Sequence, residues 1–327
     1  MTYCDSVKTT TLISTMKETH TTAMVCVPLI LKMLHDSILR KVDKLSPMQR
    51  QFFQLLLFVS KFLLKFDIRV GKLLFKSIHN ELGGGLRGFI SGGAPLNLDV
   101  ELNLNAMGFR VLQGYGLTET APVISVNTFK HNRMGSVGRP LEGVEVKILK
   151  ETDDAKDGEI ITRGPHMMKG YYQNPEKTAE IIKDGWLYTG DIGYFDDAGF
   201  LHISGRSRNL IVLGAGKKVF PEEVEEVIGK SPYIKEICVL SKIAAQGVRK
   251  GCEEVYAVIV PNLDSFDESE RKDEQKIKDK ISSEITRLSV DLAEYKRIMD
   301  FEIWHDELPK TATRKVKRKI LTEIVNK

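Results

Sequence analysis

The most apolar part of the chain is the stretch from Gln51 to Phe66, and basic residues follow it at regular spacing. Its longest uninterrupted apolar run, Leu55–Val59, is far shorter than the roughly 20 residues that cross a bilayer. Five basic residues recur every three or four positions, which places them along one helical face: Lys61, Lys65, Arg69, Lys72 and Lys76. The pattern predicts a basic helical segment over residues 36–80.

This segment has two interpretations. Between Arg40 and Lys76 there are nine Lys or Arg residues but only two acids, Asp43 and Asp67. A basic amphipathic helix can lie on an anionic membrane, so residues 51–76 could make peripheral membrane contact. The plainer interpretation, which the sequence favours, is a pair of helices that pack on the core and present a solvated stripe.

After Asn80, glycines and short β-branched runs replace the helical pattern. The runs are LRGFISGGAPL, FRVLQGYGLTETAPVISV, VEVKIL and GEIITRG. Such runs are typical of strands separated by glycine-rich turns, and helical spacing connects some of them. The sequence therefore predicts a mixed α/β domain.

The last third of the chain predicts a smaller α+β unit. From residue 200 the pattern is a strand, a polar turn, a strand, a glycine-rich hairpin and a helix that begins at Pro221. Glu222 and Glu223 suit the positive end of that helix. The segments IKEICVL, EVYAVIV and DFEIWH predict further strands, which gives a βαββαβ-like order. We place the boundary at Arg208, so the expected domains are 1–207 and 208–327.

Composition narrows the class of protein. The 327 residues suggest two domains, and the formal net charge of +4 is too weak to indicate nucleic acid. With 42% hydrophobic and 28% charged residues, a disordered chain, a collagen-like repeat and a disulfide scaffold are excluded. The four cysteines form no CxxC pair, and the first residues show no signal-peptide pattern. A cytoplasmic protein is expected, with peripheral membrane association as an option.

Two glycine-containing segments that follow predicted strands are candidates for binding a ligand. SGGAPL, residues 91–96, would let a ligand approach the backbone closely, although an ordinary turn has the same composition. In QGYGLTET, residues 113–120, Tyr115 offers a flat ring, Thr118 a hydroxyl for phosphate, and Glu119 a hard oxygen for Mg²⁺. A glycine turn capped by threonine is the plain alternative for this segment.

Two further segments carry single charged candidates. In DGWLYTGDIG, Asp191 could accept hydrogen bonds from both hydroxyls of a ribose, or form a simple Asx turn. The basic run LPKTATRKVKRKIL is most simply a solvated face or a nucleic-acid patch. Pro309 and the small residues before Lys315 instead favour a loop with one specific lysine that meets a developing negative charge.

The order and spacing of GYGLTE, YTGD, GR before NLIV, and PKTAT-x-K resemble the adenylate-forming superfamily of acyl- and aryl-CoA synthetases, luciferases and peptide-synthetase adenylation domains. GGAPL, GWLYTGDIG, GRSRNLIV and GKKVFPEEVE are most similar to the long-chain fatty-acid–CoA ligase branch. The resemblance runs from about Val25 to the C-terminus. It implies an incomplete large mixed α/β adenylation domain followed by a small, mobile α+β C-terminal lid domain.

The resemblance implies ATP-dependent formation of an acyl-adenylate, with Mg²⁺, and then thioesterification with CoA. Thr118, Glu119 and Lys315 would be catalytic, with Glu119 also holding the metal, and Tyr115 would stack on adenine. Arg208 matches the hinge about which the lid swings. The implied nucleotide-binding residues are Gly92, Gly93, Ala94, Pro95, Gln113, Gly114, Tyr115, Gly116, Thr118, Asp191 and Arg206. The implied CoA-binding residues are Gly214, Ala215, Gly216 and Lys217.

Two features depart from the family's pattern. Arg314 stands where many relatives carry glycine before the lysine. The family's phosphate loop, resembling TSGTTGxPKG, has no counterpart, since KTTTLISTMKETH contains no glycine. We therefore expect a C-terminal fragment that is inactive or nearly so alone, with a complementing N-terminal portion among its partners. The alternatives are a ligase for another acid or for a carrier protein, and a non-catalytic nucleotide- or membrane-binding remnant.

Overall fold

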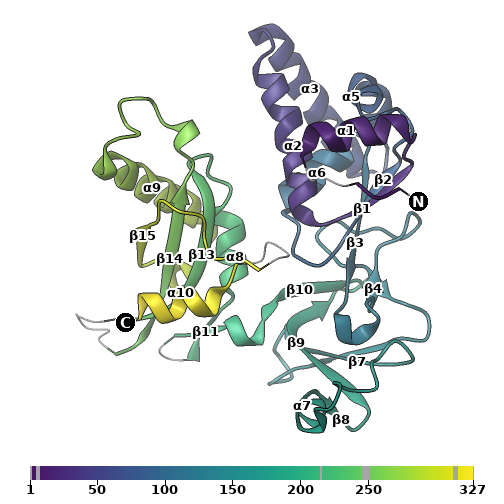
Figure 1. The fold of residues 1–327 in the computed structure, drawn as a ribbon, viewed down its shortest axis with the longest axis vertical. Coiled ribbons are helices and arrows are strands. Elements are labelled where there is room, and N and C mark those ends of the chain that lie inside the picture. Colours follow the sequence, from purple (N-terminus) through teal and green to yellow (C-terminus); the bar gives the residue numbers. More distant parts are fainter. Residues whose placement is uncertain (1, 5–7, 214–215, 245–250, 312–315, 327) are drawn as a thin grey trace. The chain divides into compact units, whose positions relative to one another are not determined.

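The computed structural model describes residues 2–4, 8–213, 216–244, 251–311 and 316–326 (Figure 1). The chain divides into two compact units. The first comprises Met1–Asp153, Ile160–Thr189 and Tyr194–Ile203, and the second comprises Asp154–Glu159, Gly190–Gly193 and Ser204–Lys327. The long final stretch of the second unit begins near Arg208, and the domain boundary at that residue stays a prediction.

Seven helices of the described residues precede residue 190 and three follow it. The first group is α1 (Thr9–Glu18), α2 (Pro28–Asp43), α3 (Pro47–Leu64), α4 (Gly71–Leu74), α5 (Lys76–Glu81), α6 (Leu98–Ala106) and α7 (Pro175–Ile181). The second group is α8 (Pro221–Ile228), α9 (Glu274–Leu288) and α10 (Arg318–Val325). No helix in these described ranges is long and apolar enough to cross a membrane.

Two sheets lie N-terminal in the chain, and only some of their strands lie in runs that the sequence predicted as strands; those at 23–26, 139–140, 182–183 and 186–195 were not predicted. The first has the order β1-β2-β3-β4-β5, in which β1, β2 and β3 are parallel and the later pairs antiparallel. Its strands are β1 (Ala23–Cys26), β2 (Gly88–Ser91), β3 (Arg110–Tyr115), β4 (Ser125–Val126) and β5 (Arg139–Pro140). The second has the order β10-β9-β7-β6, with β8 paired to β9. Its strands are β6 (Glu145–Leu149), β7 (Gly158–Arg163), β8 (Ile182–Lys183), β9 (Trp186–Phe195) and β10 (Leu201–Arg206).

The second unit contains the predicted hairpin and the predicted small sheet. β11 (Ile211–Val212) and β12 (Lys218–Val219) form the antiparallel hairpin. β13 (Ile234–Ile243) and β14 (Glu253–Pro261) are antiparallel, and β15 (Asp300–Ile303) runs parallel to β14. α8 begins at Pro221 with Glu222 and Glu223 in its first turn, as predicted. The mixed α/β architecture with a C-terminal domain is confirmed.

The prediction that five basic residues share one helical face is wrong, because the helix ends before four of them, with Lys65 at its C-cap. α3 begins with a capping box between Ser46 and Gln49 and ends at Leu64. Asp67 then adopts a φ of 57°, and the Ile68 N–H donates to the Leu63 carbonyl at 3.1 Å. A left-handed residue of this kind ends a helix, so Arg69, Lys72 and Lys76 lie on later segments.

Candidate functional site

The carboxyl ends of β2 and β3 bring the first two glycine segments together. The strands are parallel, with Ser91 opposite Gln113, so the residues that follow them leave the sheet at one edge. Ligands bind at this edge in open α/β sheets. A Cβ on Gly92 would lie 3.2 Å from the carbonyl oxygen of Gly114, and one on Gly93 would meet nothing within 4 Å. The Gly92–Pro95 segment thus presents open backbone beside Gly114.

The loop after β3 is closed by its own backbone. A Cβ on Gly116 would lie 1.7 Å from the carbonyl oxygen of Pro122, so only glycine fits there. The hydroxyl of the buried Thr120 accepts from the Leu117 N–H at 2.9 Å and lies 3.0 Å from the Pro122 carbonyl oxygen. This closure leaves Thr118 exposed and Glu119 half-buried. The sequence offered a glycine turn capped by threonine as the plain alternative for this segment, and Thr120 makes such a cap.

Glu119 has a partner that the sequence did not indicate. The Tyr171 hydroxyl donates to Glu119 Oε1 at 2.8 Å, and the Met168 N–H donates to the Glu119 carbonyl at 2.8 Å. In the part of the chain that the structure describes, no three His, Cys, Asp or Glu side chains cluster as a metal site. Mg²⁺ is commonly held by one or two carboxylates together with phosphates and water, and a single Glu119 fits that arrangement.

The side chain of Gln113 points into the protein. Its amide donates to Glu101 Oε2 at 2.8 Å, and the Gly135 N–H donates to the same oxygen at 3.0 Å. Glu101 is fully buried, and burial raises the pKa of its carboxyl from 4.5 to about 7, against the opposing effect of these two hydrogen bonds. The side chain of Gln113 is thus engaged with Glu101, and its role in nucleotide binding stays a prediction.

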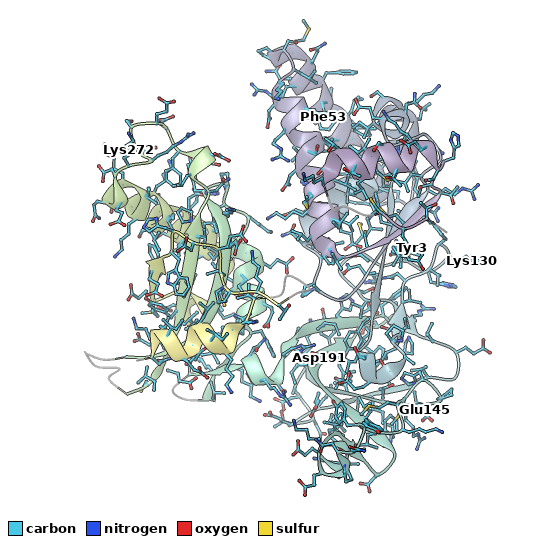
Figure 2. All side chains as sticks on the ribbon, in the orientation of Figure 1. Tyr3, Phe53, Lys130, Glu145, Asp191 and Lys272 are labelled. Atoms are coloured by element: carbon cyan, nitrogen blue, oxygen red, sulfur yellow. The ribbon has the colours of Figure 1, made fainter. Side chains whose placement is uncertain are left out.

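In the second unit, two of the predicted nucleotide-binding residues form a carboxylate–guanidinium pair. Asp191 in β9, labelled in Figure 2, is almost fully buried. Its Oδ1 lies 2.9 Å from Nε of Arg206, the last residue of β10. The neighbouring backbone is held on both sides, because Gly190 N–H donates to Glu159 at 3.1 Å and Ser207 Oγ donates to the Gly190 carbonyl at 3.1 Å. The two residues predicted to bind ribose therefore lie in direct contact.

Of the predicted hinge, CoA-binding and catalytic-lysine residues, the structure describes only some. Arg208 is exposed in the short helix Ser207–Asn209, and Lys217 Nζ lies 4.7 Å from the ring centroid of Tyr295. Gly216 has a φ of 73° with open space where a Cβ would be. Gly214, Ala215 and Lys315 lie outside the described residues.

Two family models match most of the chain. Residues 2–172 match the AMP-binding enzyme model, and residues 223–315 match the model of the AMP-binding enzyme C-terminal domain. The chain belongs to the AMP-binding enzyme family. The resemblance to the adenylate-forming superfamily is thereby confirmed.

Curated relatives of this AMP-binding protein carry ligase names. It is 35% identical over 262 residues to "Long-chain-fatty-acid--CoA ligase" of Escherichia coli O157:H7, which covers 77% of this chain and 41% of the relative. It is 33% identical over 270 residues to the protein of that name from Bacillus subtilis (strain 168), covering 78% and 44%. A chloroplastic "Long-chain-fatty-acid--[acyl-carrier-protein] ligase" of Arabidopsis thaliana is 36% identical over 228 residues, covering 65% and 30%. The chain thus spans less than half the length of these relatives.

Solved structures share the fold of nearly the whole chain. The anthranilate CoA ligase AuaEII superposes with a TM-score of 0.72 at 22% identity, covering 99% of this chain and 54% of that one, and shows the fold alone. ATP-bound MatB from Rhodopseudomonas palustris has a TM-score of 0.68 at 28% identity, covering 96% and 52%. MenE from Bacillus subtilis, with an acyl-adenylate bound, has a TM-score of 0.68 at 25% identity, covering 97% and 53%.

Proposed function

We propose that the chain contributes the described site to an AMP-forming fatty-acid–CoA ligase. The observation that carries the proposal is the open glycine backbone where β2 ends beside Gly114 of β3, together with the exposed Thr118 and half-buried Glu119 in the loop that follows β3. The names of the E. coli and B. subtilis relatives support a fatty acid as the substrate. ATP and CoA are the co-substrates, and Mg²⁺ is the metal.

The proposed reaction has two steps. An oxygen of the fatty-acid carboxylate attacks the α-phosphorus of ATP, the bond to the bridging oxygen breaks, and acyl-adenylate and pyrophosphate form. The thiolate of CoA then attacks the acyl carbon, and AMP leaves with the electron pair of the broken acyl–oxygen bond. Since the substrate supplies the nucleophile, the protein contributes position and charge rather than a nucleophilic side chain.

The candidate site residues of the first unit would bind the adenine, the acyl group and the phosphates. The Gly92–Pro95 backbone would lie against adenine and the acyl group, and Tyr115 would stack on the base. The exposed Thr118 hydroxyl would donate to a phosphate oxygen. Glu119 would hold Mg²⁺, which when bound would offset negative charge on the phosphates.

The second unit would bind the ribose. It would also supply Lys315 in the adenylation step and the CoA-binding residues in the thioesterification step. Asp191, fixed by Arg206, would accept hydrogen bonds from the ribose hydroxyls. Lys315 would stabilise charge during adenylation, and this role rests on the PKTATRK sequence alone. Arg208 would be the hinge, and Gly214–Lys217 would face CoA during thioesterification.

Binding of a stable acyl-adenylate mimic tests the site directly. Palmitoyl-sulfamoyladenosine should bind the chain, and Asp191→Asn should weaken binding roughly ten- to hundredfold through loss of charge-assisted hydrogen bonds. The control is Glu145→Gln, which removes a carboxylate from another arginine pair, 2.7 Å from Arg163 (Figure 2). Equal affinity of Asp191→Asn and the unaltered chain by calorimetry would refute the ribose role. Failure of the unaltered chain to bind would instead favour a non-catalytic protein.

Turnover is a separate question. We propose that the 327 residues alone release little AMP from ATP, fatty acid and CoA, because they contain no TSGTTGxPKG-like loop. Robust acid- and CoA-dependent AMP release would contradict this.

The name of the Arabidopsis relative supports a second acceptor, an acyl-carrier protein. When catalysis is restored by a complementing N-terminal portion, transfer of labelled palmitate to CoA or to carrier protein decides between the two. A ligase for another acid is tested with acetyl-sulfamoyladenosine. If the chain bound this compound more tightly than palmitoyl-sulfamoyladenosine, a ligase for a shorter acid would be favoured.

A further inference from the structure

Helix α3 is apolar on two opposite faces. One face packs on the core through Phe53 and Leu57, while Ser60 Oγ donates to the Ala106 carbonyl at 2.6 Å. The face away from the core is exposed, with four large side chains at spacings of three or four residues: Phe52, Leu55, Phe58 and Phe62. Between 52% and 68% of each is accessible. Helices on a protein surface normally carry polar residues there, and a continuous apolar line marks an interaction surface.

Basic residues border this apolar face. From Pro47 to Lys76 the chain has six Lys or Arg residues and a single acid, Asp67. Asp67 pairs with Arg69 at 2.9 Å, so its charge is offset locally. Lys61 and Lys65 lie four residues apart at the end of α3, on the same flank of the helix. The surface therefore combines exposed aromatic side chains with an excess of positive charge.

The segment after α3 adds a cationic cavity of about 200 Å³. Arg69, Lys72, Arg87 and Arg110 line it, and none of its lining residues is acidic. Its frame is tightly packed, because a Cβ on Gly71 would lie 2.2 Å from the Ala106 carbonyl oxygen. Among the described residues, Lys72 and Arg87 have no ion pair. Exposed cations without an ion pair favour phosphate groups.

We propose that α3 and the basic residues that follow it dock this protein onto an anionic phospholipid bilayer. Phe52, Leu55, Phe58 and Phe62 enter the boundary between headgroups and acyl chains, and the basic residues meet the lipid phosphates. The excess of cations argues for this occupant, because an anionic surface complements it and a second copy of the same basic surface would repel it.

The helix lies in the plane of the membrane rather than across it. Its 18 residues include buried ones that remain packed on the core, so α3 is not available as a spanning segment. A helix with a basic flank and exposed Phe and Leu side chains is typical of interfacial binding. The inference rests on the surface of the first unit and does not depend on the proposed catalytic function.

Vesicle flotation with the full 327-residue chain tests the proposal. The chain should float with phosphatidylcholine vesicles that contain phosphatidylglycerol, and far less with phosphatidylcholine alone. Phe58→Glu/Phe62→Glu should abolish flotation, because it puts two anions at the membrane boundary. Lys65→Glu/Lys72→Glu should weaken it roughly tenfold or more and reduce its sensitivity to salt, because both substitutions replace attraction to the anionic surface by repulsion while other basic residues remain.

Matched controls separate this surface from general changes in polarity and charge. Val290→Glu/Met299→Glu alters two exposed apolar residues elsewhere, and Lys130→Glu/Lys278→Glu makes the same change in net charge as the lysine variant on other exposed segments. Both should float like the unaltered chain, and circular dichroism verifies that every variant is folded. The proposal is overturned if the unaltered chain stays at the bottom, or if the α3 variants float equally well. It is also overturned if Phe58→Glu/Phe62→Glu only converts a dimer to a monomer in light scattering, which would identify an interface between copies.

Discussion

Replacement of Glu101 by glutamine should remove the pH dependence that this buried carboxyl imposes on the stability of the first unit. Glu101 Oε2 accepts from Gln113 and Gly135, whereas Oε1 has no hydrogen-bond partner among the described residues. Burial raises the pKa of the carboxyl to about 7, so the folded state holds a proton that the unfolded state has already lost. The contribution of Glu101 to the free energy of unfolding is therefore fully present below pH 4.5 and is lost as the pH rises to about 7.

The size of the effect follows from the two pKa values. The shift from 4.5 to about 7 corresponds to about 3.4 kcal/mol at 1.36 kcal/mol per pKa unit. Linkage places about 2.5 kcal/mol of this between pH 5 and pH 8. Glutamine keeps an oxygen for the two donors and does not ionise. The free energy of unfolding of Glu101→Gln, relative to the native sequence, should thus rise by about 2.5 kcal/mol over that range.

Urea unfolding followed by tryptophan fluorescence measures this difference. The chain has two tryptophans, Trp186 in the first unit and Trp304 in the second. Both proteins therefore carry Trp304→Phe, so that the signal comes from the unit that contains Glu101. Other titrating groups cancel in the comparison. A stability difference between the two proteins that stays constant from pH 5 to pH 8 would refute the reasoning.

Two further predictions follow from buried groups of the chain. Arg318→Met should destabilise the second unit by up to about 3 kcal/mol, because the largely buried Glu225, 2.6 Å from Arg318, loses its counter-charge. Glu225→Leu/Arg318→Met should recover most of that loss in urea unfolding followed at Trp304, and an equally unstable double variant would contradict this account. Iodoacetamide at pH 8 should label the exposed Cys4 and Cys252 but spare Cys26 and Cys238, because burial raises the pKa of both of the latter thiols to about 12. Peptide mass spectrometry that finds Cys238 modified in the folded protein would contradict this labelling pattern.

The parts of the fold that the sequence predicted are those encoded by neighbouring residues. The glycine-separated strands depend on turn residues, and the start of α8 depends on Pro221 and the acids of its first turn, all within a few positions. The end of α3 was missed because the basic spacing continues past Leu64, while the left-handed turn at Asp67 interrupts the helix. Periodicity alone carries no information about where a helix stops.

Contacts between distant segments could not be predicted. Nothing near Glu101 indicates that it is buried against Gln113, since an acid in the first turn of a helix usually faces water. Tyr171 meets Glu119 from a segment 52 residues later, outside any motif. The contact between Asp191 and Arg206 joins two motifs that the sequence showed only as separate features.

The closed loop after β3 also affects how this family can be traced through diverged sequences. Because a Cβ on Gly116 would collide with the Pro122 carbonyl, a saturation library should lose every substitution at position 116. Exposed Thr118 should accept serine in the same library. The closed backbone of this loop determines where the backbone of Glu119 lies. In remote descendants, the glycine is therefore a better marker than the acid for whether the loop itself has been inherited.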